Sequence, residues 1–140
     1  MTGIQGLAWV PGAAEGPLLP LGAPLSLWGG VDPETGRVTD PRHPDAGRSL
    51  AGRIVAFPAT VGSSSSSAVL LELIRHGVAP HGIVLPKGDA ILALGSLVAR
   101  ELGYRPVPIL IAPPETWAAI PAGTVVRLDP LPAGTEATPT

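Results

Sequence analysis

The chain contains no cysteine, and only 14% of its 140 residues are charged. Without thiols it cannot form a disulfide, bind a metal through thiolates or hold an iron–sulfur cluster on cysteines of its own. The 9 basic and 11 acidic residues form no basic patch, so nucleic acid is not an expected partner. So low a charged fraction in a small domain also indicates a surface that a partner covers.

Long apolar runs are missing as well. No run approaches the ~18–20 residues of a membrane span, and the N-terminus lacks the basic and apolar segments of a secretory signal. The chain also lacks the Gly-Lys-Ser/Thr of a phosphate-binding loop and the Gly-x-Ser-x-Gly of a nucleophile elbow. With 45% hydrophobic residues it can still bury a core, and we expect one soluble cytoplasmic domain.

From residue 51 onward, apolar segments of strand length alternate with segments of helical periodicity. The pattern predicts strands over residues 52–57, 82–85, 107–111 and 124–128, and helices over residues 67–76 and 90–102. Asp89 is expected to cap the second helix, and Gly77 and Gly103 to end the two helices. Because a strand–helix–strand order requires parallel pairing, the fold class is α/β, a mixed sheet with parallel βαβ units.

The first 50 residues contain shorter elements. Two strands are expected over residues 5–12 and 15–21, and Pro17 and Pro20 should confine the second to an edge or a bulge. Both strands are too closely joined for crossovers, so they should add an antiparallel portion. Residues 24–48 form a long glycine-rich polar loop, typical of a functional segment. We expect one domain over residues 1–130, followed by a flexible tail over residues 131–140.

A run of five serines, Ser63 to Ser67, follows Gly62 at the turn between a predicted strand and a predicted helix. At such a turn, backbone N–H groups converge and favour an anion, including the alkoxide of a serine placed there. Helix capping is the alternative interpretation, because serine is a preferred N-cap. Capping accounts for one or two serines but not for five. The residues alone leave both interpretations equally open.

Two segments taken together resemble the small subunit of the aconitase X family. The first contains Trp28-Gly29-Gly30 within residues 24–33 and continues to His43-Pro44, and the second runs from Gly62 to Glu72. The resemblance covers about residues 3–128. It implies a swivelling β/β/α domain similar to the C-terminal domain of aconitase. It also implies a separate large subunit that carries an iron–sulfur cluster or metal, which agrees with the missing cysteines.

The resemblance further implies a hydro-lyase that is active only with that large subunit. In the family, the serine directly after the glycine of this turn is the general base, a role that falls on Ser63. Around it, Gly62, Ser64 and Ser65 would bind substrate. The other segment would supply an interface or substrate loop through Ser26, Trp28, Gly29, Gly30, Asp32 and His43. No residue of this chain is expected to bind a metal.

The resemblance leaves the substrate open between two 3-hydroxy acids. Bacterial members dehydrate cis-3-hydroxy-L-proline, and archaeal members dehydrate 5-phosphomevalonate. The unbroken serine run replaces the Gly-Ser-Thr-Val-Gly-Ser typical of archaeal small subunits, which favours the hydroxyproline branch. A non-catalytic module that binds an anion or a partner remains an alternative.

Overall fold

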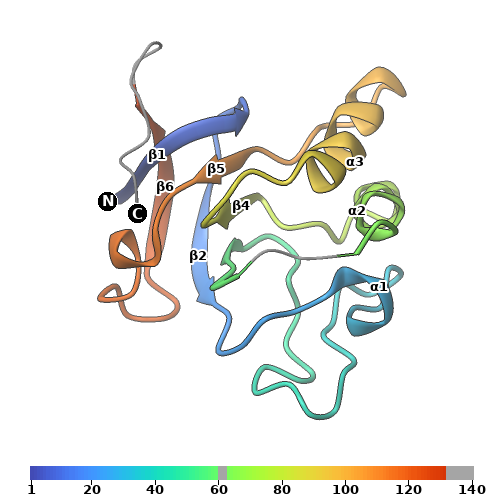
Figure 1. Ribbon diagram of the computed structural model, residues 1–140, viewed down its shortest axis with the longest axis horizontal. Coiled ribbons are helices and arrows are strands. Elements are labelled where there is room, and N and C mark those ends of the chain that lie inside the picture. Colours follow the sequence, from blue (N-terminus) through green and yellow to red (C-terminus); the bar gives the residue numbers. More distant parts are fainter. Residues whose placement is uncertain (60–62, 132–140) are drawn as a thin grey trace.

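The computed structural model of this protein describes residues 1–59 and 63–131. Six strands close into a barrel in the order β1-β5-β4-β3-β2-β6 (Figure 1). The strands are β1 (Thr2–Val10), β2 (Glu15–Pro20), β3 (Ile54–Ala56), β4 (Gly82–Leu85), β5 (Ile109–Ile111) and β6 (Val125–Pro130). The helical elements are α1 (Leu27–Gly30), α2 (Ser66–Arg75), α3 (Ala90–Glu101) and the 3-10 turn η1 (Pro114–Thr116).

The strand pairing is mixed, as the sequence predicted. β3, β4 and β5 are parallel neighbours joined through α2 and α3. β1 and β2 contribute the expected antiparallel pairs, with β5 and β6 respectively. β1 also runs parallel to β6, and β2 parallel to β3, and these pairings close the sheet on itself.

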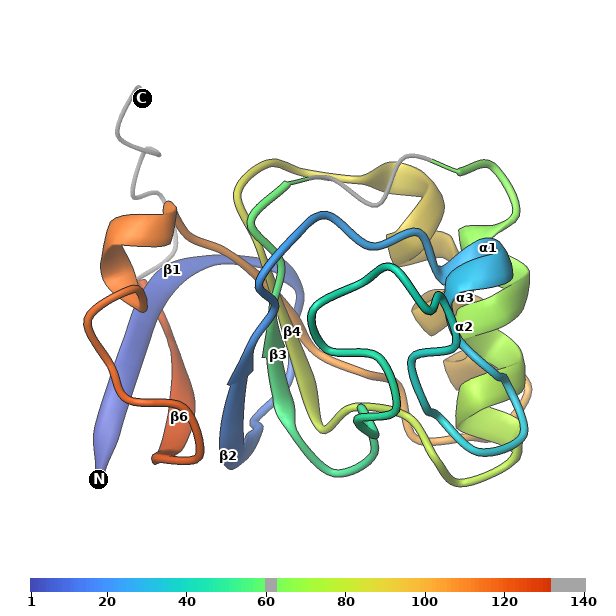
Figure 2. The same cartoon turned by 90° about the horizontal axis from the view of Figure 1, so that it is seen from below.

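Two apolar cores lie on the two faces of the barrel wall. α2 and α3 pack side by side against the outside of the barrel (Figure 2). Along β3, Val55 belongs to the core beneath the helices, whereas Ile54 and Ala56 point into the barrel interior. Because both faces of these strands are buried, they form continuous apolar runs rather than alternating ones.

The ends of α3 are fixed by the residues that the sequence indicated. The side chain of Asp89 accepts a hydrogen bond from the Leu92 amide at 3.0 Å, which satisfies one of the first N–H groups of the helix. Gly77 and Gly103 follow α2 and α3 with φ of +70° and +89°, the left-handed conformation that glycine adopts most easily.

Within the described residues, no helix combines the length and apolarity needed to cross a bilayer.

The prediction that β2 is an edge strand or bulge was wrong. β2 lies between two neighbours, but it pairs with β6 through residues 15–17 and with β3 through residues 18–20. The Leu18 amide donates to the Thr124 carbonyl, on the side of β6, and the Leu21 amide donates to the Ala56 carbonyl, on the side of β3. Successive amides of a strand point to opposite sides, so Pro17 faces the side of β3 and Pro20 faces the side of β6. Pro17 precedes the residues that pair with β3, and Pro20 follows those that pair with β6, so neither position requires an N–H donor. Both prolines are therefore tolerated inside a closed barrel.

Candidate functional site

The serine turn, defined here as Ser63 to Ser67, lies between β3 and α2 at the carboxyl ends of β3 and β4 (Figure 2). Ser63 is half-buried, and its Oγ accepts a hydrogen bond from the Ser65 amide at 3.2 Å. Its carbonyl oxygen accepts a second bond from the Ser66 amide at 3.1 Å. The Ser63 hydroxyl is thus oriented by the backbone that leads into α2. Gly62 lies outside the described residues.

The serines do not cap α2. Ser65 occupies the N-cap position, yet its side chain makes no capping hydrogen bond. The first amide of this region to donate along the helix is that of Val69, to the Ser65 carbonyl at 3.3 Å. Among the described residues, the amides of Ser64, Ser67 and Ala68 have no acceptor. The positive end of the α2 dipole is therefore left open at the turn, which favours negative charge there.

The C-terminal half of the serine turn is fixed by packing. Ser66 is fully buried, and its Oγ has no partner among the described residues. Ser67 lies directly against Gly95 of α3, where a Cβ would come within 2.5 Å of the Ser67 carbonyl oxygen. Only glycine permits so close an approach of the two helices. The position of the serine turn thus depends on α3 as well as on α2.

A second predicted segment, the tryptophan loop over residues 26–32, lies beside α2 (Figure 1). Its element α1 is not a regular helix: Trp28 has φ −71° and ψ 116°, and Gly29 has φ +77° and ψ −12°. These angles describe a type II turn, which requires glycine at its third position. The turn leaves the Trp28 side chain 63% exposed, while Gly30 is buried. Ser26 supports it through a 3.2 Å hydrogen bond from Oγ to the Trp28 carbonyl.

The two remaining predicted residues, Asp32 and His43, bond to backbone groups on either side of the tryptophan loop. The Asp32 carboxylate accepts from the Glu34 amide at 2.9 Å, the hydrogen bond of an Asx turn. His43 is buried; its Nδ1 accepts from the Asp45 amide at 3.0 Å, so Nε2 carries the proton and donates to the Ala23 carbonyl at 3.0 Å. Both ring nitrogens are therefore occupied within the chain.

Replacing His43 with alanine is expected to lower the free energy of unfolding by about 1–3 kcal/mol, because the buried ring is lost and two partly buried backbone groups lose their partners. Urea denaturation followed by circular dichroism measures the change. His76→Ala is the matched control: the side chain of His76 is 41% exposed, so its loss should stay within about 0.5 kcal/mol. Equal effects of the two variants would contradict the structural role of His43.

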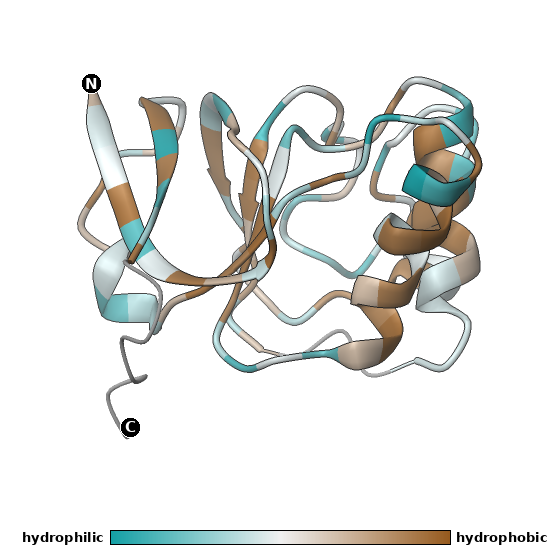
Figure 3. Ribbon diagram, turned by 90° about the horizontal axis from the view of Figure 1, so that it is seen from above, coloured by the Kyte–Doolittle hydropathy of each residue, from teal (hydrophilic) through white to brown (hydrophobic). Residues whose placement is uncertain are grey.

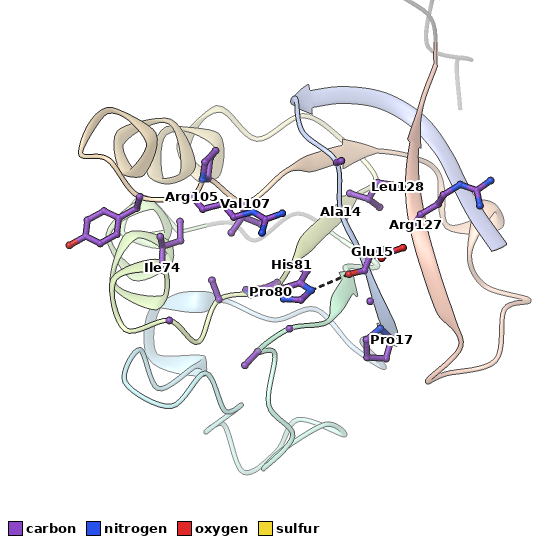
Figure 4. Close-up of a pocket in the computed structure, with 18 of the residues that line it drawn as sticks. Ala14, Glu15, Pro17, Ile74, Pro80, His81, Arg105, Val107, Arg127 and Leu128 are labelled. Atoms are coloured by element: carbon purple, nitrogen blue, oxygen red, sulfur yellow. Dashed lines mark hydrogen bonds between the residues drawn. The ribbon is translucent and has the colours of Figure 1, made fainter. Parts of the chain in front are cut away.

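A groove of about 1060 Å³ opens at the opposite end of the barrel, at the amino ends of β3 and β4. Figure 4 shows His81 in its centre, where Nδ1 lies 3.0 Å from the Glu15 carbonyl oxygen. None of the residues predicted for the site lines this groove. Since ligands of α/β sheets bind at the carboxyl ends of the strands, the serine turn is the better candidate site.

The described residues contain no group of three or more His, Asp or Glu side chains that could hold a metal ion. The groups around the serine turn are hydroxyls and backbone amides, a poor donor set for iron.

At the other end of α2, Glu72 binds Arg75 at 2.7 Å and, together with Tyr104, raises the pKa of the guanidinium. That ion pair is remote from the serine turn.

Comparison with known proteins decides the family. A sequence profile described as the aconitase X swivel domain matches residues 3–135. The chain belongs to the aconitase X swivel-domain family. The crystal structure of Thermococcus kodakaraensis aconitase X superposes with a TM-score of 0.75 at 34% identity, over 88% of each chain. The mixed α/β swivelling fold predicted from the sequence is thereby confirmed.

Two relatives of this aconitase X domain carry different names. Cis-3-hydroxy-L-proline dehydratase of Pseudomonas aeruginosa is 52% identical over 100 residues, 71% of this chain but 17% of the relative. The phosphomevalonate dehydratase small subunit of Thermococcus gammatolerans is 44% identical over 96 residues, 69% of this chain and 73% of the relative. The chain thus matches about a sixth of the first relative's length and most of the second's.

Gly95 contacts the serine turn from the neighbouring helix, a role that was not predicted from the sequence. A signal was present, because glycine inside a helical pattern indicates a close approach of another backbone. The burial of Ser66 had no such signal, since the five serines are identical in the sequence and only packing distinguishes them.

Proposed function

We propose that this chain is the small subunit of a heteromeric aconitase X-type dehydratase, and that Ser63 is its general base. The observation that carries the proposal is the Ser63 hydroxyl, oriented by the Ser65 amide beside the uncapped N-terminus of α2. The proposed substrate is a 3-hydroxy acid, cis-3-hydroxy-L-proline in the first place. The 52% identity to the P. aeruginosa enzyme supports that substrate.

The electrostatics of the turn suit a base that acts as an alkoxide. A neutral hydroxyl is too weak to take a proton from carbon, so the charged form must be stabilised. The Ser65 amide already donates to Ser63 Oγ, and the open amides at the start of α2 add the positive end of the helix dipole. Fixed donors of this kind need no rearrangement when charge develops.

In the proposed reaction, Ser63 Oγ takes the proton from the α-carbon of the substrate. The electron pair of the broken C–H bond forms the double bond between the α- and β-carbons, and the β-hydroxyl takes a proton from solvent and leaves as water. The proton taken by Ser63 stays on Oγ until it passes to solvent. Because the described residues of this chain do not fit a metal or iron–sulfur cluster, we propose that the large subunit holds any such group.

The tryptophan loop is proposed to contact the substrate or the large subunit. Trp28 is presented on a type II turn with 63% of its surface exposed, which suits an aromatic contact to another chain. Asp32 and His43 fix the backbone on either side of the loop through hydrogen bonds to the Glu34 amide, the Ala23 carbonyl and the Asp45 amide. In this arrangement Trp28 makes the contact, and the two polar residues position it.

Reconstitution with a family large subunit tests the proposal. The complex should dehydrate cis-3-hydroxy-L-proline, and neither subunit alone should do so. Turnover of 5-phosphomevalonate instead would assign the chain to the alternative branch, which the 44% identity to the T. gammatolerans small subunit supports. A stable complex that turns over neither substrate would contradict the proposed activity and favour a non-catalytic binding module.

A further inference from the structure

α3 presents an exposed face without charge. Its first ten residues, 90–99, contain no charged side chain, and the first charges follow at Arg100 and Glu101. Figure 3 shows that most of the helix is hydrophobic, on the outer side of the molecule. Ile91 and Leu94, three residues apart on one face, are 42% and 53% exposed. A helix that is apolar on all sides is normally buried, so this face lacks its cover.

Trp9 of β1 lies at the start of α3, where Lys87 and Asp89 flank the uncharged stretch. Its indole Nε1 donates to the carbonyl of Asp89 at 3.1 Å, at the start of α3. Its ring lies against Gly88, where a Cβ would come within 2.8 Å of it. The side chain is therefore held in place while 43% of Trp9 stays exposed. An immobilised aromatic next to exposed aliphatic side chains is the usual composition of an interface centre.

The uncharged face continues to the serine turn. A dent of about 120 Å³ lies between α2 and α3, and its lining includes Leu94, Gly95, Ser67 and Ala68. Gly95 packs directly on the Ser67 backbone, so Leu94 lies one residue from the contact that fixes the turn. We call Trp9, Ile91, Leu94 and this dent the α3 face.

We propose that the α3 face is the surface on which the large subunit docks, an inference that rests on the proposed function. The match to this chain covers only 17% of the P. aeruginosa relative, so most of that polypeptide lies outside the matched stretch. The T. gammatolerans relative is a small subunit by name. A base that completes a site on another subunit needs the contact surface beside it, and the α3 face is in that place.

A second copy of this chain is the competing occupant of the α3 face. A symmetric dimer through α3 would place another copy of the serine turn beside the first, and the two copies would obstruct the approach of a large subunit. The large subunit covers the face and completes the site in one contact, which is why we favour it. The mass of the isolated chain in solution distinguishes the two.

Isothermal titration of a family large subunit with the full chain tests the inference. Leu94→Asp should raise the Kd by about 30-fold or more, because it places a charge at the centre of an apolar contact. Ile91→Asp, on the same helix face, should have a similar effect. Val125→Asp is the matched control: Val125 is 49% exposed but lines the groove at the other end of the barrel, so its Kd should change less than about twofold.

The thermal unfolding temperature of each variant is measured as well, to distinguish a lost contact from a variant that is unfolded. If Leu94→Asp, Ile91→Asp and Val125→Asp all bind the large subunit with the wild-type Kd, the α3 face is not the docking surface. The proposed function is unaffected by that result. A wild-type chain that is dimeric, and becomes monomeric on Leu94→Asp without any change in Kd, would assign the face to a second copy. A wild-type chain that binds no family large subunit would overturn the proposed function and this inference together.

Discussion

Replacing Ser63 with alanine is expected to lower the dehydration rate of the reconstituted complex by about 10²–10⁴-fold, the usual contribution of a general base. The loss should appear in kcat, since the methyl group of alanine cannot accept the α-proton. The Kd for the large subunit should be unchanged, because Ser63 is half-buried in its own turn and lies outside the α3 face. Steady-state assays and titrations of the same preparations measure both quantities.

Two further variants distinguish the missing base from a disturbed turn. Ser63→Thr keeps a hydroxyl at this position, so it should retain more activity than Ser63→Ala. Thr2→Ala removes an exposed hydroxyl at the beginning of β1 and should leave the rate unchanged. Wild-type turnover by Ser63→Ala would show that the proton is taken by another group and would remove Ser63 from the mechanism.

Replacing Gly95 with alanine is expected to lower the free energy of unfolding by about 1–3 kcal/mol, because the new Cβ would overpack a helix contact. That Cβ would lie 2.5 Å from the Ser67 carbonyl oxygen and 3.0 Å from the Ser67 Cα, and backbone cannot move aside as a flexible side chain can. Glycine to alanine inside a helix normally stabilises by up to about 1 kcal/mol. The two effects therefore have opposite signs.

Chemical denaturation of Gly95→Ala gives the sign directly. We also expect a loss of dehydration rate, because the start of α2 must shift and carries the serine turn with it. Arg100→Ala, at an exposed position of the same helix, should change the unfolding free energy by less than about 0.5 kcal/mol. A Gly95→Ala variant more stable than the wild type would contradict the close approach of α2 and α3.

Elements with strong local signals were predictable from the sequence. β4 was predicted over residues 82–85 and has those bounds, because a short apolar run there is bounded by turn residues. α3 was predicted over residues 90–102 and spans Ala90–Glu101, since its cap and its terminating glycine are both local features. The serine turn was likewise placed correctly between a strand and a helix.

Features that depend on distant contacts were not predictable. The barrel closes because β6 pairs with β1 and β2, more than 100 residues earlier in the chain, and no local pattern indicates that pairing. β5 is shorter than the predicted 107–111, because the backbone of Val107 bonds to the Ser96 hydroxyl at 2.7 and 2.8 Å instead of joining the sheet. A serine within a helical pattern gives no indication of such a contact.

The candidate site shows the same division. The sequence indicated Ser63 and the tryptophan loop, but local reasoning could not choose between an anion site and a cap for the serine run. The structure shows that Ser65 does not cap α2, a result of how the turn enters the helix. The exposed α3 face was indicated only indirectly, by the low charge of the whole chain. Its position beside the serine turn follows from tertiary packing alone.

The most direct test of the account is the fate of the substrate's α-hydrogen. Cis-3-hydroxy-L-proline is incubated with the large subunit alone, with the large subunit and this chain, and with the large subunit and Ser63→Ala, and loss of the α-hydrogen signal is followed by proton NMR. We expect rapid loss only in the sample that contains the wild-type chain. Loss at the same rate with the large subunit alone, or with Ser63→Ala, would contradict it.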